Sequence, residues 1–492
     1  MKVYRLLFLS LFFGTQITLA QTGLNIPQLT NFDTAMNGLL KRYNVPGGQL
    51  AITRYGRLIY NRGFGYADTL THSLVEPNSI FRLASVSKPI TSITLMHLFQ
   101  EGKFHLDDTV FGPRGILNDT NYSHIKDPRV YNITLRNLLT HSGGWNRDIS
   151  GDPMFESWTI STAMGVTPPA GPVTIIDYVL RNQMLDFTPG TQYQYSNFGF
   201  CILGRVIEKI TGEAYENYVR DTILIPIGIT DMKTGFNLLK NQLPMEVSYY
   251  DYPGEPYIPS VYDNVTMVPF PYAGFNIEAM DSHGAWVASA ADLCKILVSV
   301  DGYYTAPDIL SPSTIDTMTH PSATNANYAL GWQVNQYHNW WHTGSLPGTS
   351  TEIVRASNQM NWAILLNYRP ENDSAITAAV DQLVWNVIPT IKSWDTLNLF
   401  TAVNTIPVPN LPTVTIYPVP SNGTVNILLA GSGYSSVRVI DLLGKEVYST
   451  SVDSQKRDQH LFISIPHVTN GLYIIQVTSE KGVVNKRLVI EK

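Results

Sequence analysis

Apolar positions change their period along the chain, and these changes predict both helices and strands. Residues 49–53 and 58–60 are strand-like runs joined by a short glycine-containing turn, so they predict a β-hairpin. Residues 90–100 are apolar on nearly all sides, which predicts a helix buried on every face. Residues 200–210 predict a second helix that stops at Gly212, since glycine is favoured just beyond a helix C-terminus.

The pattern further along predicts the rest of one mixed α/β (α+β) domain. Residues 290–298 predict a short helix, and residues 375–387 predict a closing helix. Three runs near the end predict strands: 332–334, 351–354 and 362–366. Strands near both ends, with helices between them, indicate a sheet completed by the terminal segments.

Two long stretches fit neither period. Residues 148–173 and 249–276 are rich in proline, glycine and aromatic residues. Long ordered loops in a compact domain are often lids or walls of a functional site. Ordinary packing of aromatic side chains over the helical layer is an equally good explanation, so both alternatives stay open.

The C-terminal part of the chain has a different pattern. Residues 406–412 hold three prolines and predict a stiff, extended linker. Beyond it, short alternating runs separated by turn signals predict a small all-β, immunoglobulin-like sandwich. These runs are 425–427, 437–439, 461–463, 473–477 and 486–490. The predicted divisions are a main domain over 21–398, a linker over 399–413 and the sandwich over 414–492.

Residues 1–20 have the pattern of a secretory signal peptide. Lys2 and Arg5 precede the apolar run 6–13, and small residues end at Ala20. A membrane anchor is disfavoured because the run is too short to span a bilayer. We predict cleavage before Gln21 and a mature protein, with no transmembrane segment, that works outside the cytoplasm.

Composition narrows the possible classes of function. Of the 492 residues, 44% are hydrophobic and 15% charged, which suits a large core and excludes wholesale disorder. The net charge of -6 argues against a nucleic-acid binder. The 2 cysteines, Cys201 and Cys294, exclude a disulfide-rich scaffold and a zinc site built on cysteine alone. Both lie in apolar stretches and are interpreted as buried small residues.

Candidate chemistry begins with a Ser-x-x-Lys motif, Ser85 and Lys88, just before the buried helix. If Ser85 begins that helix, the two side chains share a face, and the hydroxyl lies in the positive field of a helix N-terminus. A serine needs a neighbouring base, and a lysine serves when burial lowers its pKa. The motif alone is a weak signal, but the apolar helix after it argues against an exposed Lys88.

Two more motifs add polar groups. Tyr195 and Asn197 precede the second predicted helix, where the tyrosine would shuttle protons and the asparagine would hold a substrate amide or orient Lys88. Taken alone, they are better explained as a core tyrosine and a simple helix N-cap. Residues 342–345 predict a strand whose Ser345 N–H would face a substrate oxyanion, or else a turn at a strand end.

Together the three motifs resemble the serine β-lactamase and penicillin-binding-protein family, in its class C and esterase-like branch. Segments 106–110, 133–144 and 284–289 are similar too, and the resemblance covers about residues 25–394. It implies an antiparallel sheet with a helical layer, an acyl-enzyme on Ser85, and no metal or cofactor. The implied roles are proton transfer by Lys88 and Tyr195, substrate binding by Asn197, His342, Thr343, Gly344 and Ser345, and an oxyanion hole made by the Ser85 and Ser345 N–H groups.

His342 departs from the family pattern, which usually has a lysine that grips a substrate carboxylate. A histidine in the cleft is mostly neutral at neutral pH, so we expect esters, small amides or D-amino-acid peptides as substrates. The other histidines, such as His97, His141 and His283, lack metal-ligand spacing and are interpreted as structural.

The leading hypothesis is a secreted serine hydrolase that cleaves an ester or amide bond. The alternatives are a true β-lactamase or peptidoglycan D,D-peptidase and, from another class, a non-catalytic cell-surface binding protein. The presence of all four polar residues, Ser85, Lys88, Tyr195 and Asn197, argues against the last.

The C-terminal sandwich resembles the sorting domain of proteins exported by type IX secretion. The matching segments are 417–423, 441–445 and 470–473, with a basic end at 486–487, and the departure is Val419, where that family usually has Asn. The resemblance implies export across an outer membrane, the secretion machinery as a partner, and then release or surface attachment. A carbohydrate- or partner-binding sandwich is the alternative.

Overall fold

The computed structural model describes residues 20–371, 373–402, 413–417, 421–430, 432–441, 445–479 and 482–492. By its internal contacts the chain divides into two units after Leu399. The predicted signal peptide, apart from Ala20, and residues 403–412 of the predicted linker lie outside the described residues. The start of the linker contributes a short helix, α12 (Leu399–Ala402).

The predicted hairpin is confirmed and supplies two neighbouring strands of the main sheet. Strands β2 (Gly47–Arg54) and β3 (Arg57–Asp68) are joined through Tyr55 and Gly56, with φ of 51° and 72°. Two consecutive positive φ values are the geometry of the tight turn that matches strand twist, and glycine supplies one of them without strain.

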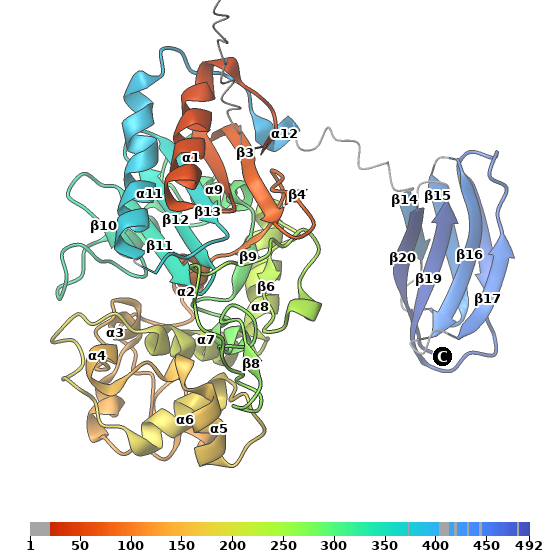
Figure 1. The fold of residues 1–492 in the computed structure, drawn as a ribbon. Coiled ribbons are helices and arrows are strands. Elements are labelled where there is room, and N and C mark those ends of the chain that lie inside the picture. The colour runs from red at the N-terminus through yellow and green to blue at the C-terminus, as the bar shows by residue number, and fades with distance from the viewer. Residues whose placement is uncertain are drawn as a thin grey trace, which may run out of the picture. The chain divides into compact units, whose positions relative to one another are not determined.

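The two ends of the first unit meet in this sheet, as predicted. Strand β13 (Met360–Leu366) lies antiparallel to β2. The sheet runs β1 (Gln21–Thr22), β3, β2, β13, β12 (Thr349–Ala356), β11 (Trp340–Leu346) and β10 (Gln333–Val334), with β4 (Ser73–Leu74) on β3. Helices α1 (Thr30–Tyr43) and α11 (Asp373–Val387) cover one face, and α9 (Ala290–Val298) packs on the other (Figure 1).

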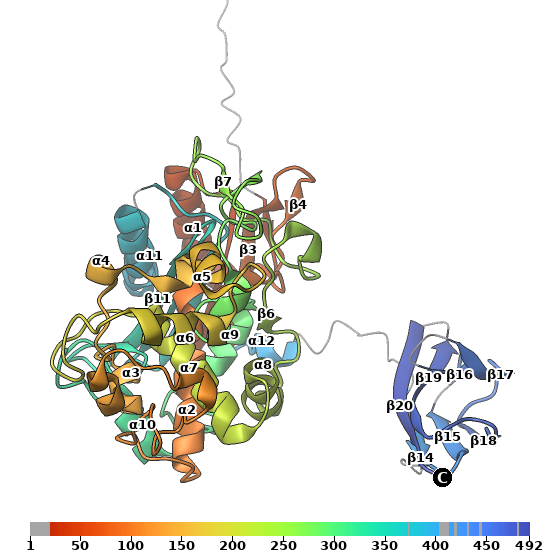
Figure 2. The same cartoon turned by 90° about the horizontal axis from the view of Figure 1, so that it is seen from below.

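A helical layer lies below the sheet in Figure 1. Its centre is α2 (Ser87–Gln100), nearly every residue of which is buried, and α7 (Asn197–Thr211) packs against it (Figure 2). The C-cap of α7 is Gly212, with φ of 75°, as the sequence predicted. The other helices of the unit are α3 (Leu135–Leu139), α4 (Arg147–Ser150), α5 (Ser157–Met164), α6 (Pro172–Asn182), α8 (Tyr215–Tyr218) and α10 (Pro312–Thr319).

The two irregular stretches differ from each other in the structure. Residues 148–173 contain α5 and most of α4, so the absence of a helical period there was misleading. Helices of four and eight residues are too short to show a clear 3.6-residue period. Residues 249–276 are mostly loop, with only the two-residue strands β7 (Ile258–Pro259) and β8 (Met267–Val268).

A small separate sheet pairs β5 (Phe81–Arg82) and β6 (Lys233–Thr234) with β9 (Trp286–Ala288). Cys201 and Cys294 are buried free thiols, as interpreted.

The second unit is all-β. One of its sheets contains β14 (Thr413–Tyr417), β15 (Thr424–Ala430) and β18 (Gln459–Ser464). The other contains β17 (Glu446–Ser451), β16 (Tyr434–Asp441), β19 (Gly471–Ser479) and β20 (Gly482–Ile490). All five predicted strands are present, while β14 and β17 were not predicted. Within the part of the chain that the structure describes, no helix is long and apolar enough to cross a bilayer.

Candidate active site

Ser85 lies in a tight turn that leads into the buried helix. The short 3₁₀ turn Ala84–Val86 connects β5 to α2, which begins at Ser87, so Ser85 stands just before the helix instead of opening it. Ala84 has φ of 49°, an unusual value for a residue with a side chain. Such strained positions are found preferentially at functional sites, because the surrounding structure must hold them in place.

Strand β11 passes directly against this turn. A Cβ atom at Gly344 would collide with the carbonyl oxygen of Leu83 and lie 3.1 Å from the Cβ of Ala84. From the neighbouring strand, the Thr351 hydroxyl donates to the same Leu83 oxygen at 2.7 Å. Only glycine fits at position 344, and its absence of a side chain brings the backbone of residues 343–345 beside Ser85.

The side chain of Ser345 is exposed and that of Thr343 is half-buried. The oxyanion hole formed by the backbone N–H groups of Ser85 and Ser345 remains a prediction, as does the substrate contact of residues 343–345.

Lys88 is fully buried, with three polar neighbours. Its Nζ lies 3.0 Å from Ser85 Oγ, 2.8 Å from Asn197 Oδ1 and 3.2 Å from the carbonyl oxygen of His283. Burial lowers the pKa of Lys88 well below its usual value; the carboxylate of Asp152 opposes this shift and the guanidinium of Arg147 adds to it. A neutral amine beside a serine hydroxyl is chemically able to accept its proton.

Tyr195 approaches Ser85 from the other side. Its hydroxyl donates to Ser85 Oγ at 2.6 Å, and Lys88 Nζ lies 4.7 Å from the centre of its ring. Burial raises the pKa of the phenol above its ordinary value. The tyrosine is therefore a neutral donor in this state.

Asn197 is the first residue of α7, and it is not the helix cap. Ser196 caps the helix by accepting from the N–H of Gly199 at 3.0 Å, which leaves the Asn197 carboxamide free for other contacts. Its Oδ1 faces Lys88, and its Nδ2 donates to Asp152 Oδ2 at 2.7 Å. The sequence-based alternative of a simple N-cap is therefore wrong.

The side chain of His342 is placed differently from the prediction, which put it in the substrate cleft. It is only 1% exposed, and its Nδ1 and Nε2 lie 2.7 Å from the Thr343 carbonyl oxygen and 3.1 Å from the Tyr328 hydroxyl. Burial, with a contribution from Lys88, lowers its pKa to about 3. The imidazole is thus neutral over the physiological range and engaged at both nitrogens.

His141 was interpreted as structural, yet it lies against the site. Its ring centre is 4.4 Å from that of Tyr195, and its Nε2 is 2.9 Å from the Tyr328 hydroxyl. The N–H of Ser196 can only donate to His141 Nδ1, at 3.1 Å, so the proton of the neutral ring is on Nε2. The Tyr328 hydroxyl then accepts a hydrogen bond from His141 and donates one to His342. Every donor and acceptor in this hydrogen-bonded series has a partner while both imidazole rings are neutral.

Three residues near the site were not predicted: Tyr328, Asp152 and Arg147. The Arg147 guanidinium lies 5.2 Å from the centre of the Tyr195 ring. Arg147 opens α4, and Asp152 follows that helix within the first irregular stretch, whose interpretation as a wall of a functional site was the only signal for Asp152. Nothing in the local sequence distinguishes Tyr328 from an ordinary core tyrosine.

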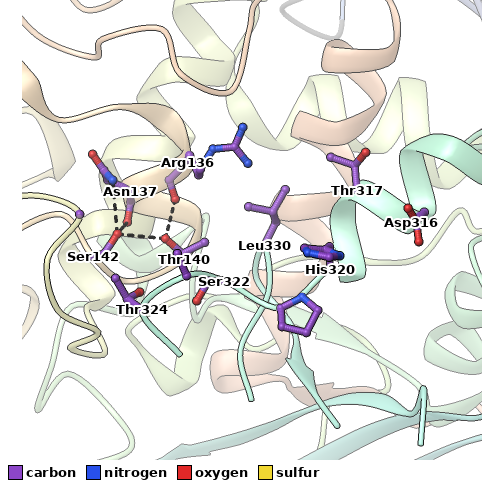
Figure 3. A pocket seen from close by; sticks show the side chains of 13 residues that line it. Arg136, Asn137, Thr140, Ser142, Asp316, Thr317, His320, Ser322, Thr324 and Leu330 are labelled. Carbon is purple, nitrogen blue, oxygen red and sulfur yellow. Dashed lines mark hydrogen bonds between the residues drawn. The ribbon is translucent and has the colours of Figure 1, made fainter. Parts of the chain in front are cut away.

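A pocket of about 550 Å³ lies between α3 and the segment after α10, and neither Ser85, Lys88 nor Tyr195 lines it (Figure 3). Thr140 and Ser142, which flank His141, form one side, and Ser322 and Thr324, a few residues before Tyr328, form another. The pocket is therefore lined by residues that neighbour His141 in the sequence, while His141, Tyr328 and His342 themselves do not line it. Among the described residues, no group of three His, Cys, Asp or Glu side chains is placed to hold a metal ion.

The antiparallel sheet, the helical layer and the meeting of Ser85, Lys88 and Tyr195 define a β-lactamase-related serine hydrolase. Comparison with family profiles agrees: residues 32–384 match the β-lactamase profile, and the chain belongs to this family. Residues 415–491 match the secretion system C-terminal sorting domain, which confirms the second resemblance and implies export.

Individual relatives show moderate similarity. A probable fimbrial assembly protein, FimD, of Dichelobacter nodosus is 32% identical over 286 residues, which are 56% of this chain and 63% of that protein. A putative D-alanyl-D-alanine carboxypeptidase of Escherichia coli O157:H7 is 24% identical, over 65% of this chain and 75% of that protein. The chain thus spans less than two thirds of the Dichelobacter protein.

The fold is also similar to solved structures. The D-amino acid amidase of Ochrobactrum anthropi SV3, complexed with D-phenylalanine, has a TM-score of 0.56 and 21% identity, covering 73% of this chain and 99% of that one. At this level of identity the likeness establishes the shared fold alone.

Proposed function

We propose that the protein is an exported serine hydrolase that works through an acyl-enzyme on Ser85. The arrangement of Ser85, Lys88 and Tyr195 is the observation that carries this proposal. Lys88 Nζ takes the proton of Ser85 as Oγ bonds to the substrate carbonyl carbon and the carbonyl electron pair moves to oxygen. The N–H groups of Ser85 and Ser345 stabilise that oxyanion.

Tyr195 then assists departure of the leaving group. Its hydroxyl gives a proton to the leaving oxygen or nitrogen and regains one from Lys88, and its distance of 2.6 Å from Ser85 Oγ supports this role. The C–O or C–N bond breaks as the carbonyl re-forms, which leaves the acyl group on Ser85. Water, activated by the same groups, hydrolyses the ester and restores the serine.

For the substrate we propose an uncharged ester, or an amide of the D-amino-acid type. The buried, neutral His342 supports this choice, because it provides no cation for a substrate carboxylate. The amidase from Ochrobactrum anthropi, which shares the fold, supports the amide. A D,D-peptidase is the second candidate, favoured by the similarity to a putative D-alanyl-D-alanine carboxypeptidase. A true β-lactamase is less well supported, because its substrates carry a carboxylate.

The C-terminal unit is proposed to direct the protein through the secretion machinery to the cell surface or the medium. The sorting-domain match supports this destination, and the signal peptide expected at residues 1–20 would provide the first export step.

Covalent labelling tests the catalytic proposal. A fluorophosphonate and a fluorescent penicillin are each applied to the wild type and to Ser85→Ala, and hydrolysis of p-nitrophenyl acetate, D-phenylalanine amide and nitrocefin is measured in parallel. We expect labelling and hydrolysis in the wild type alone, with the ester or amide preferred to nitrocefin. Equal labelling of Ser85→Ala would refute the mechanism, and an inert wild type would favour a binding protein.

A further inference from the structure

Asp152 lies beside the candidate active site and takes no direct part in the mechanism above. Its Oδ1 accepts from the backbone N–H of Met154 at 3.1 Å, and its Oδ2 accepts from Nδ2 of Asn197 at 2.7 Å. The segment that carries it is held in place by Asp186, whose Oδ2 accepts from the Ser150 hydroxyl at 2.8 Å. The carboxylate is therefore fixed and directed at the Asn197 carboxamide.

Asp152 determines which way round the Asn197 carboxamide lies. A carboxamide has a donor end and an acceptor end, and a neighbour that can both donate and accept tolerates either orientation. Neutral Lys88 is such a neighbour, because its amine has two N–H groups and one lone pair. A carboxylate can only accept, so Asp152 requires the Nδ2 end to face it. The Oδ1 end is then turned toward Lys88, 2.8 Å away.

This orientation in turn directs the lone pair of Lys88. Two of the three neighbours of Nζ, Asn197 Oδ1 and the His283 carbonyl oxygen, can only accept. In the charged form Nζ donates its third N–H to Ser85 Oγ at 3.0 Å. In the neutral amine the two acceptors use both N–H groups, so the lone pair takes the place of that third N–H and faces Ser85 Oγ. Since Tyr195 donates to the same Oγ, the Ser85 hydroxyl proton is directed at Lys88.

We infer that Asp152 is a positioning residue: by fixing the carboxamide of Asn197, it directs the Lys88 lone pair at the Ser85 hydroxyl. The inference rests on the proposed function, because it assumes that Lys88 takes the Ser85 proton. Once that proton has moved, the ammonium has three N–H groups and the same three oxygen neighbours to receive them. The arrangement thus suits Lys88 both before and after proton transfer.

The surroundings of Lys88 give the inference a distinctive pH signature. Two charged side chains face the amine: Asp152, which raises its pKa, and Arg147, which lowers it. The remaining titratable neighbours are held neutral by burial: Tyr195, His141, His283 and His342. Removing the negative charge at position 152 therefore lowers the pKa of Lys88 further.

The test compares Asp152→Asn, Asp152→Glu and the control Asp148→Asn in the full chain. Asp148 is an exposed acidic residue of the same segment. Acylation by p-nitrophenyl acetate is followed in the first turnover across the acid and neutral pH range. Asp152→Asn offers a carboxamide that can pair either way round, so we expect acylation about ten- to a hundredfold slower, with the acid limb displaced to lower pH. Asp152→Glu keeps an acceptor-only carboxylate and should recover part of the rate, while the control should match the wild type.

Several outcomes would overturn the inference. One is a wild-type acylation rate in Asp152→Asn. Another is an acylation rate that falls by the same factor at every pH while the acid limb stays at the wild-type pH, which is the result expected of a purely structural residue. Ser85→Ala, measured alongside, separates the two proposals: if it is still acylated, the proposed function fails. If acylation depends on Ser85 but not on Asp152, only the positioning role fails. Should Asp152→Asn not fold, Asp152→Glu provides the test. It is expected to keep part of the wild-type rate with its acid limb at the wild-type pH, and a loss of rate as large as in Lys88→Met would contradict the inference.

Discussion

The two units of the chain bury different kinds of side chain. The core of the C-terminal unit consists of aliphatic residues and two tyrosines, and the buried polar residues described there are the uncharged Ser421, Gln459 and Ser479. The first unit buries twelve described side chains that carry acidic or basic groups: Asp33, Arg62, Arg82, Lys88, Asp127, His141, Arg205, His283, Asp301, His342, Glu352 and Arg355. Taking such groups out of water is unfavourable unless they are partnered or neutral. Four of the twelve, Lys88 and the three histidines, lie in or next to the candidate active site. At these four positions the first unit gives up stability for chemistry, a cost for which the described core of the second unit has no counterpart.

Of the changes that test this difference between the units, Lys88→Met should have the largest effect on the acylation rate. Loss of the base should slow acylation about 10²–10⁴-fold. The same change should raise the melting temperature at neutral pH, because the folded-state pKa of Lys88 lies below its unfolded value. Proton binding then favours the unfolded chain. The destabilisation caused by Lys88 is therefore greatest at low pH, and it disappears above the pKa that Lys88 has in the unfolded chain. First-turnover kinetics and thermal unfolding measure both effects; a variant with normal acylation and lower stability would contradict the contrast.

His283→Leu should stabilise the first unit. The side chain is 2% exposed, neither ring nitrogen has a hydrogen-bond partner in the described structure, and burial lowers its pKa. Replacing an unpartnered buried polar group should gain about 1–3 kcal/mol at neutral pH. Below a pH of about 6.5 the histidine binds a proton in the unfolded chain but stays neutral in the folded one. The stability gained by His283→Leu should therefore grow by about 1.4 kcal/mol for each unit by which the pH falls.

Chemical unfolding at several pH values measures that gain. The matched control is His467→Leu, an exposed histidine of the C-terminal unit, which should change stability by no more than about 0.5 kcal/mol at any pH. A gain in His283→Leu that does not vary with pH would mean that the histidine is already charged in the folded state.

His342→Lys should alter selectivity. Its ring centre is 6.4 Å from that of Tyr195, so a lysine there would bring an ammonium group toward the nucleophile. A charge-assisted hydrogen bond is worth about 1.5–3 kcal/mol, so kcat/KM for a cephalosporin relative to a neutral ester should rise roughly ten- to a hundredfold. The variant should also be less stable, because the lysine replaces a neutral partner of Tyr328. An unchanged ratio would show that position 342 does not select the substrate class.

Ending the chain at Leu399 should have the smallest effect on catalysis. The internal contacts of the first unit end there, so kcat/KM for p-nitrophenyl acetate should stay within about twofold of the full chain. In the native host the shortened protein should fail to be exported, which immunoblotting of cell and medium fractions would detect. A large loss of activity would mean that the C-terminal unit takes part in catalysis.

Local sequence determined much of the architecture. The predicted helix at 290–298 has the bounds of α9, and the predicted stop at Gly212 is the observed C-cap of α7. These features depend on hydrophobic periodicity and capping within one segment, which a sequence displays directly. The short strands β14 and β17 and the short helices α4 and α5 were missed, since short elements give little periodicity and rely on contacts with the rest of their unit. Helices α1 and α6 were not predicted either, although they have 14 and 11 residues.

The sequence by itself also named the residues that meet at the site: Ser85, Lys88, Tyr195 and Asn197 come together as the motif order implied. Only the tertiary structure decided their protonation and orientation. It buried His342 against Tyr328, brought His141 to a tyrosine 187 positions away, and set Asp152 on Asn197 across 45 positions. A pKa depends on burial and on neighbouring charges, and in this protein both come from segments that are distant in the sequence.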